Sequence, residues 1–163
     1  MSVKLTPVGE QLILERIEKL NEELKYVREE KNIAYTLCGD TWHDNPHFNK
    51  LEQDEKILDM RIREIEQILT TAQRIKLDSR NTEKVDLGSI VKCFCEYPDF
   101  EEEETYEIVG YGESNIDENK LVYDSPVAKN LLGLSVGEKV SFEIPTGKTT
   151  FTVLEMFNSW DEV

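Results

Sequence analysis

Residues 38–48 read CGDTWHDNPHF, and this short break decides how the first half of the chain folds. Gly39 suits the left-handed backbone conformation that commonly closes a helix. Asn45 suits the cap of a new helix, and Pro46 suits its first position. Long helical patterns lie on both sides of the break, which therefore predicts the turn of a helical hairpin.

Apolar residues on either side of this break recur at alternating spacings of three and four, which is typical of a coiled-coil seam. The first seam is Ile13, Ile17, Leu20, Leu24, Val27, Lys31, Ala34 and Cys38, and the second is Phe48, Leu51, Glu55, Leu58, Ile62, Ile65, Leu69 and Ala72. Facing residues of an antiparallel hairpin have a nearly constant sum of residue numbers, and here each facing pair adds to 85 or 86. The spacing therefore predicts two antiparallel helices that turn at residues 41–44.

Lys31 and Glu55 are the polar exceptions in the two seams, and the same register places them opposite each other. An internal ion pair would penalise shifted registers, because either charge would then meet an apolar side chain. The alternative is that both side chains extend outward along the helix surface.

The pattern changes after Arg74, and residues 76–88 have the composition of a linker. Five strand-like runs follow, at 89–97, 105–111, 119–124, 139–144 and 149–157, with a helical pattern at 125–133. We therefore expect an α+β protein. A coiled-coil hairpin domain would span residues 1–78, and a small antiparallel sheet domain with one short helix would span residues 79–163.

Two features of the second half have simple structural interpretations. The acidic run at residues 99–106, DFEEEETY, is expected to form an exposed loop between two strands. Cys93 and Cys95 share one face of a predicted strand. We expect them to pack in the core, because no second cysteine pair is present to complete a metal site.

Composition limits the functions that the chain can have. Its net charge is −15; residues 1–80 carry 13 basic and 16 acidic side chains, and residues 81–163 carry 6 and 18. Such an acidic second half argues against wrapping nucleic acid, which requires a basic face. No apolar run approaches the ~18 residues of a membrane span, and the start lacks the apolar core of a secretory signal. Three cysteines predict no disulfide framework, so we expect a reducing, cytoplasmic setting without a membrane partner.

The order of hairpin, acidic tip and small sheet domain resembles the bacterial transcript cleavage factors GreA and GreB, and the resemblance covers essentially the whole chain. TPVG at 6–9 resembles the T-x-x-G entry to the first helix of that family. Residues 61–75 resemble its R-I-x-x-I-E-x-x-L-x-x-A-x-x-I segment. Three later blocks resemble its FKBP-like C-terminal domain, namely YEIVG at 106–110, SPVAKNLLG at 125–133 and IPTGKTTFTVLEM at 144–156.

This resemblance implies a factor that enters the secondary channel of RNA polymerase, where backtracked RNA extrudes its 3′ end. Asp40 and Asp44 would help the polymerase to hold its catalytic Mg²⁺, so that the polymerase cleaves its own transcript. The factor would then not be an enzyme itself and would have no cofactor of its own. It would share Mg²⁺ with the polymerase only within the complex, and it would contact the nascent RNA indirectly. We expect Trp42 to be exposed at the apex, and our hypothesis is that it packs against the polymerase or stacks on RNA or a nucleotide in the channel. We also expect tip contacts by His43 and Asn45. The resemblance also implies polymerase docking by Ser125 and Pro126.

The tip departs from the family pattern G-D-x-x-E-N, because it is one residue longer and Asp44 replaces the glutamate. A channel-binding paralogue that inhibits or regulates the polymerase without promoting cleavage is therefore the nearest alternative. The residues also leave open a prolyl isomerase, a structural coiled-coil adaptor, and a zinc site formed by Cys38, His43 and His47. A hairpin that buries its own seam gives no reason to dimerise, so we expect a monomer.

Overall fold

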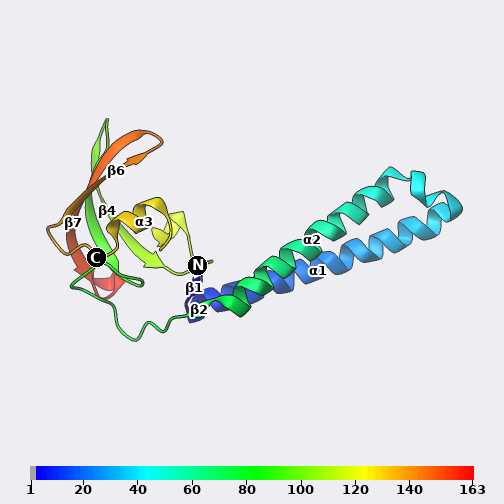
Figure 1. Cartoon of the computed structure of the whole chain (residues 1–163), viewed down its shortest axis with the longest axis horizontal. Helices are drawn as coiled ribbons and strands as arrows, with labels where there is room; N and C mark the ends of the chain where they lie inside the picture. Colours follow the sequence, from blue (N-terminus) through cyan, green and yellow to red (C-terminus); the bar gives the residue numbers. More distant parts are fainter. Residues whose placement is uncertain (1–2) are drawn as a thin grey trace. The chain divides into compact units, whose positions relative to one another are not determined.

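The computed structural model describes residues 3–163, which form two compact units (Figure 1). Residues 10–72 belong to the first unit, and residues 4–9 together with 73–163 form the second. The first unit is built from α1 (Pro7–Cys38), the 3₁₀ helix η1 (Gly39–Asp44) and α2 (Pro46–Thr71). Figure 1 shows α1 and α2 running side by side from their open end to η1. The predicted helical hairpin and the position of its turn are confirmed.

The predicted seam holds the two helices together. The buried side chains that form its core are Leu24, Val27, Ala34, Phe48, Leu51, Leu58 and Ile62, and Leu20 and Trp42 pack partly against them. All of these except Trp42 are seam positions of the sequence pattern. Because each helix buries only one stripe, the outer faces of both helices stay in solvent, which is the behaviour of a coiled coil.

Lys31 and Glu55 meet across this seam as an ion pair. Only 25% of the Lys31 side chain and 16% of the Glu55 side chain are exposed, so the alternative in which both extend outward is wrong. Arg28 adds a second contact, since its Nε donates to Glu55 Oε1 at 2.9 Å. Hydrogen bonds from Lys31 and then Arg28 are the main causes that lower the pKa of Glu55. Glu55 is therefore held as a carboxylate between two cations.

We predict that Glu55→Leu destabilises the hairpin by about 1–2 kcal/mol, because half-buried Lys31 loses its partner. Lys31→Leu should cost less, since Arg28 still pairs with Glu55. The double variant Lys31→Leu/Glu55→Leu should recover most of the loss by restoring an apolar seam. Thermal unfolding followed by far-ultraviolet circular dichroism measures all three; equal midpoints for Glu55→Leu and the double variant would refute the pairing.

The second unit contains a five-stranded sheet in the order β5-β4-β3-β7-β6. The strands are β3 (Ile90–Glu96), β4 (Glu101–Val109), β5 (Lys120–Val122), β6 (Lys139–Ile144) and β7 (Gly147–Phe157). A short parallel pair joins β1 (Lys4–Leu5) to β2 (Gln73–Arg74). The remaining elements are the helix α3 (Pro126–Leu131) and the 3₁₀ turns η2 (Ile116–Glu118) and η3 (Trp160–Glu162). The predicted α+β class, with one short α-helix beside a sheet, is confirmed.

The core of this unit lies where α3 packs on the sheet. Its buried side chains are Val85, Val91, Cys93, Cys95, Tyr106, Ile108, Ala128, Leu131, Phe151 and Val153. Cys93 and Cys95 are fully buried free thiols, as predicted. Burial raises the pKa of each thiol to about 12. Both therefore stay protonated and serve as packing groups.

Two details of the sheet differ from the sequence prediction. The acidic run expected to be a loop instead starts β4, because Glu101–Glu104 continue the backbone ladder opposite Cys93–Glu96. Lys92 Nζ on β3 lies 2.6 Å from Glu103 Oε2 on β4 and offsets part of the negative charge of the acidic run. The expected all-antiparallel order is also wrong at one place, since β5 pairs with β4 in parallel. The chain reaches this parallel position by the excursion through η2, which local patterns do not encode.

Thr6 and Gly9 explain the T-x-x-G pattern at the start of α1. Thr6 Oγ1 accepts a hydrogen bond from Gly9 N at 3.1 Å and donates one to the carboxylate of Glu113. A Cβ atom on Gly9 would lie only 2.7 Å from the carbonyl oxygen of Tyr111. The glycine is therefore required by close backbone approach, and the threonine caps the helix while it binds the loop after β4.

We predict that Gly9→Ala destabilises the second unit by about 1–3 kcal/mol, because the added methyl group overlaps a backbone oxygen that cannot easily move. Val8→Ala, at the exposed neighbouring position, is the matched control and should change stability little. Urea denaturation followed through Trp160, in a Trp42→Phe background, reports on this unit alone. Equal denaturation midpoints for the two variants would contradict the packing argument.

Within residues 3–163, no helix is long and apolar enough to cross a membrane.

Candidate functional site at the hairpin tip

The tip is a short turn closed by local hydrogen bonds. Gly39 has a φ of +50°, which confirms the left-handed position predicted for it. Thr41 Oγ1 donates to the carbonyl of Cys38 at 2.8 Å. The Asn45 side-chain oxygen accepts from the backbone N–H groups of His47 at 2.9 Å and Phe48 at 3.4 Å. Asn45 therefore caps α2, as the sequence predicted, and Pro46 takes the first helical position.

Asp40 and Asp44 lie on η1 and are exposed. Among the residues that the structure describes, neither carboxylate takes part in a hydrogen bond or an ion pair. Their oxygens are therefore available to a partner molecule. Carboxylate oxygens are the ligands that Mg²⁺ prefers in proteins.

Trp42 is half-buried, so the expectation that it stands exposed at the apex is wrong. Its ring meets that of Phe48 edge-on, with centroids 5.0 Å apart, and lies 5.8 Å from the ring of Tyr35. The His43 ring lies beside it, with centroids 3.4 Å apart and the planes tilted by 36°. The 3₁₀ turn brings Trp42 back onto the end of the seam, where it closes the apolar core. The heptad pattern stops before this residue and could not place it.

We predict that Trp42→Ala lowers the stability of the hairpin by about 1–3 kcal/mol, because it uncovers Phe48 and leaves part of the core open. His43→Ala, which removes an exposed ring from the same turn, should cost clearly less. The midpoints of thermal unfolding, measured by far-ultraviolet circular dichroism, compare the two variants. A Trp42→Ala midpoint equal to that of the unaltered protein would mean that the ring contacts carry no stability.

Asn45 and His43 are engaged mainly within the tip. The Asn45 side-chain nitrogen donates to Cys38 Sγ at 2.7 Å, so both ends of this amide are used. His43 is exposed, and its carbonyl accepts from the Asn49 side chain at 3.3 Å. Over the described range 3–163, no three His, Cys, Asp or Glu side chains are grouped to hold a metal ion. The zinc alternative built on Cys38, His43 and His47 is therefore not supported, because the turn does not gather these donors.

Ser125 and Pro126, the residues predicted for docking, begin α3 in the second unit. Ser125 Oγ accepts from the backbone N–H of Ala128 at 3.2 Å, and Pro126 follows at the first helical position. Pro126 is exposed and Ser125 is half-buried. The pair therefore has a clear structural role as a helix start and still presents surface to solvent.

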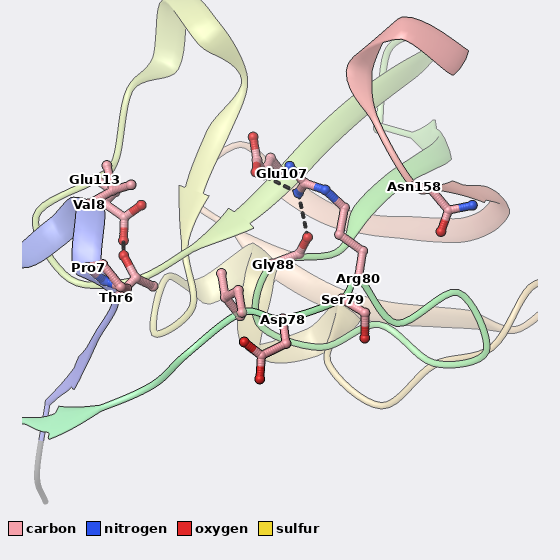
Figure 2. Close-up of a pocket in the computed structure, with 11 residues that line it drawn as sticks. Thr6, Pro7, Val8, Asp78, Ser79, Arg80, Gly88, Glu107, Glu113 and Asn158 are labelled. Atoms are coloured by element: carbon pink, nitrogen blue, oxygen red, sulfur yellow. Dashed lines mark hydrogen bonds and ion pairs between the residues drawn. The ribbon is translucent and has the colours of Figure 1, made fainter.

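The second unit also contains a cavity of about 500 Å³, which no sequence pattern indicated (Figure 2). Arg80 Nη1 lies on one wall and donates to Glu107 at 2.7 Å and to the Gly88 carbonyl at 2.6 Å. Figure 2 shows the Thr6–Glu113 bond on the other side. The second oxygen of Glu107 accepts from Trp160 Nε1 at 2.8 Å. These charged groups are satisfied by one another, so we assign them a structural role in holding the linker on the sheet.

Comparison with known proteins gives a consistent result. Residues 80–157 match the family model described as transcription elongation factor, GreA/GreB, C-terminal. The chain is 35% identical over 151 residues to transcription elongation factor GreA of Halalkalibacterium halodurans, covering 89% of this chain and 94% of that protein. It is 36% identical over 138 residues to GreA of Geobacillus kaustophilus, covering 80% and 85%. The solved structure of GreA factor homolog 1 (Gfh1) from Thermus thermophilus is 27% identical, with coverage of 96% and 99% and a TM-score of 0.41.

Proposed function

Because this chain belongs to the GreA/GreB family of transcription elongation factors, we propose that it enters the secondary channel of RNA polymerase in the cytoplasm and stimulates cleavage of backtracked RNA. The polymerase supplies the nuclease centre, and this chain supplies ligands to it. The relatives that carry the name GreA match over most of their own length, so both the hairpin and the sheet domain are shared with them.

One observation carries the proposal: the tip presents two exposed carboxylates, Asp40 and Asp44, that are not used within the described fold. A carboxylate on a surface turn commonly caps a helix or pairs with a cation. Asn45 already caps α2, so neither acid is needed as the cap, although Asp44 directly precedes this cap, where a negative charge favours the helix N-terminus. They are free to bind a metal ion that another molecule brings.

Two carboxylates suit a Mg²⁺ ion whose other ligands come from a partner molecule better than an ion held by this chain alone. Mg²⁺ requires near-octahedral oxygen coordination and usually takes only one or two carboxylates from a protein. Such an ion would supply Lewis-acid stabilisation of the charge that develops during RNA cleavage. This chain would contribute the oxygens of Asp40 and Asp44 and would hold them where the seam and the Asn45 cap place them.

The two carboxylates are not equivalent. A 3₁₀ helix has about three residues per turn, so residues four apart point about a third of a turn away from each other. Asp40 and Asp44 therefore do not share one side of η1. Asp40 also matches the family pattern directly, whereas Asp44 follows the additional residue. We propose that Asp40 is the principal ligand and that Asp44 assists.

The additional tip residue also supports a second candidate, namely a factor that occupies the channel and inhibits cleavage. The turn accommodates the additional residue by forming a six-residue 3₁₀ helix, Gly39–Asp44, which the packing of Trp42 holds in place. A second carboxylate displaced in this way could occupy the metal site without aligning the attacking water. In either case we propose that Ser125 and Pro126 contact the polymerase outside the channel, and that Trp42, His43 and Asn45 contact its interior or the RNA.

The test adds the protein to stalled, backtracked elongation complexes and measures the release of short 3′ RNA fragments. We predict that Asp40→Asn slows this release by about tenfold or more, and that Asp44→Asn has a smaller effect. Glu29→Gln, which neutralises an exposed acid on the side of α1, is the matched control and should leave the rate unchanged.

The outcomes separate the two candidates. Fragment release that depends on Asp40 supports cleavage stimulation. Binding to the polymerase with release below the polymerase's own rate selects the inhibitor. Full activity of Asp40→Asn would contradict the assignment of the tip.

A further inference from the structure

Strand β6 forms one edge of the sheet, with β7 as its neighbour on the inner side (Figure 1). Val140 and Phe142 point inward and pack against the core. Lys139, Ser141 and Glu143 alternate with them and are exposed. The strand contains no proline, and its pairing with β7 has a regular register from end to end. It therefore has no bulge, proline or inward charge to prevent pairing, and its outward charges, Lys139 and Glu143, have opposite signs.

The hairpin turn determines which backbone groups of β6 face outward. Ile144 pairs with Gly147 across the two-residue turn Pro145–Thr146, so this pair exchanges both of its backbone hydrogen bonds. Hydrogen-bonded and non-hydrogen-bonded pairs alternate along an antiparallel ladder. Residues 140, 142 and 144 therefore bond to β7, and residues 139, 141 and 143 direct their N–H and C=O groups outward. In the described part of the chain, these outward groups have no hydrogen-bond partner.

The sequence of β6 is complementary to itself when two copies run antiparallel about Ser141. Lys139 of each copy then faces Glu143 of the other, so two opposite-charge pairs form. Val140 faces Phe142, which extends the apolar face of both cores, and Ser141 faces Ser141 on the two-fold axis. This register also places the outward-facing residues 139, 141 and 143 opposite one another, as an antiparallel ladder requires. The charge pairs, the apolar contacts and the outward backbone groups are therefore all matched in the same register.

We propose that β6 is a self-association edge, through which two copies of this chain form a two-fold symmetric dimer with a continuous sheet. Three hydrogen-bonded residue pairs would supply about six backbone hydrogen bonds, and the two Lys139–Glu143 pairs would fix the register. The contact is short, and each copy carries a net charge of −15, so the dimer is weak and forms at high protein concentration. This edge is separate from the seam of the hairpin, which gives no reason to dimerise.

The test measures the mass of the full-length protein by sedimentation equilibrium, from micromolar to millimolar concentration, at an ionic strength that screens the overall repulsion. The unaltered protein should shift from 18.9 kDa toward twice that mass as concentration rises. Lys139→Glu and Glu143→Lys should each stay monomeric, because each places two like-charge pairs across the axis. The combined swap Lys139→Glu/Glu143→Lys should dimerise again, and so should an equimolar mixture of the two single variants.

Ser141→Pro provides an independent test of the backbone pairing. Proline removes the outward N–H on the two-fold axis, and an edge strand tolerates it because this N–H faces solvent. The variant should remain monomeric. Because it also loses the hydrogen bond between Ser141 Oγ and Thr150 Oγ1 at 2.8 Å, its matched control is Ser141→Ala, which loses the same bond but keeps the outward N–H and should still dimerise. A constant mass of 18.9 kDa for the unaltered protein would overturn the proposal. So would self-association that neither the charge variants nor Ser141→Pro reduces, because another surface would then be responsible.

Discussion

The seam between α1 and α2 is the constraint on which the proposed function depends. A two-helix hairpin has one apolar stripe per helix, so each helix can be buried only by the other. The repeat of seven residues keeps that stripe continuous, and the Lys31–Glu55 pair makes one register preferable to its neighbours. Because the register is fixed, the position of the turn is fixed as well. The position of the two tip carboxylates therefore depends on packing along the whole hairpin.

Local contacts hold the tip in place, while its two carboxylates stay available to a partner molecule. Gly39 ends α1 in the left-handed conformation, Asn45 caps α2, and Trp42 closes the apolar core beneath the turn. These residues hold η1 in place without using the carboxylates of Asp40 and Asp44. A negatively charged, solvent-facing turn on a stiff support suits a metal ion that is buried inside another macromolecule. The same features would suit a compact enzyme poorly, since such an enzyme needs its complete set of reacting groups in one chain.

The sequence patterns correctly predicted those features of the fold that depend on residues close together in the chain. The heptad spacing identified the facing partners in the hairpin, including Lys31 and Glu55, and the turn residues identified the caps. Tertiary contacts decided the rest. Trp42 is half-buried by a 3₁₀ turn that the seven-residue period does not describe. Glu101–Glu104 join β4 because their backbone groups pair with β3. The Arg80–Glu107 bond joins residues far apart in sequence, and no local signal indicated it.

The most direct test of the proposed function shortens the hairpin while preserving its seam. Deleting residues 17–23 and 62–68 removes one heptad from each helix and draws the tip back by about 10 Å. We expect this variant to fold and still bind the polymerase, but no longer to stimulate RNA cleavage in backtracked complexes. Undiminished cleavage by the folded, shortened protein would contradict this expectation, because the tip carboxylates would then act without the full length of the hairpin.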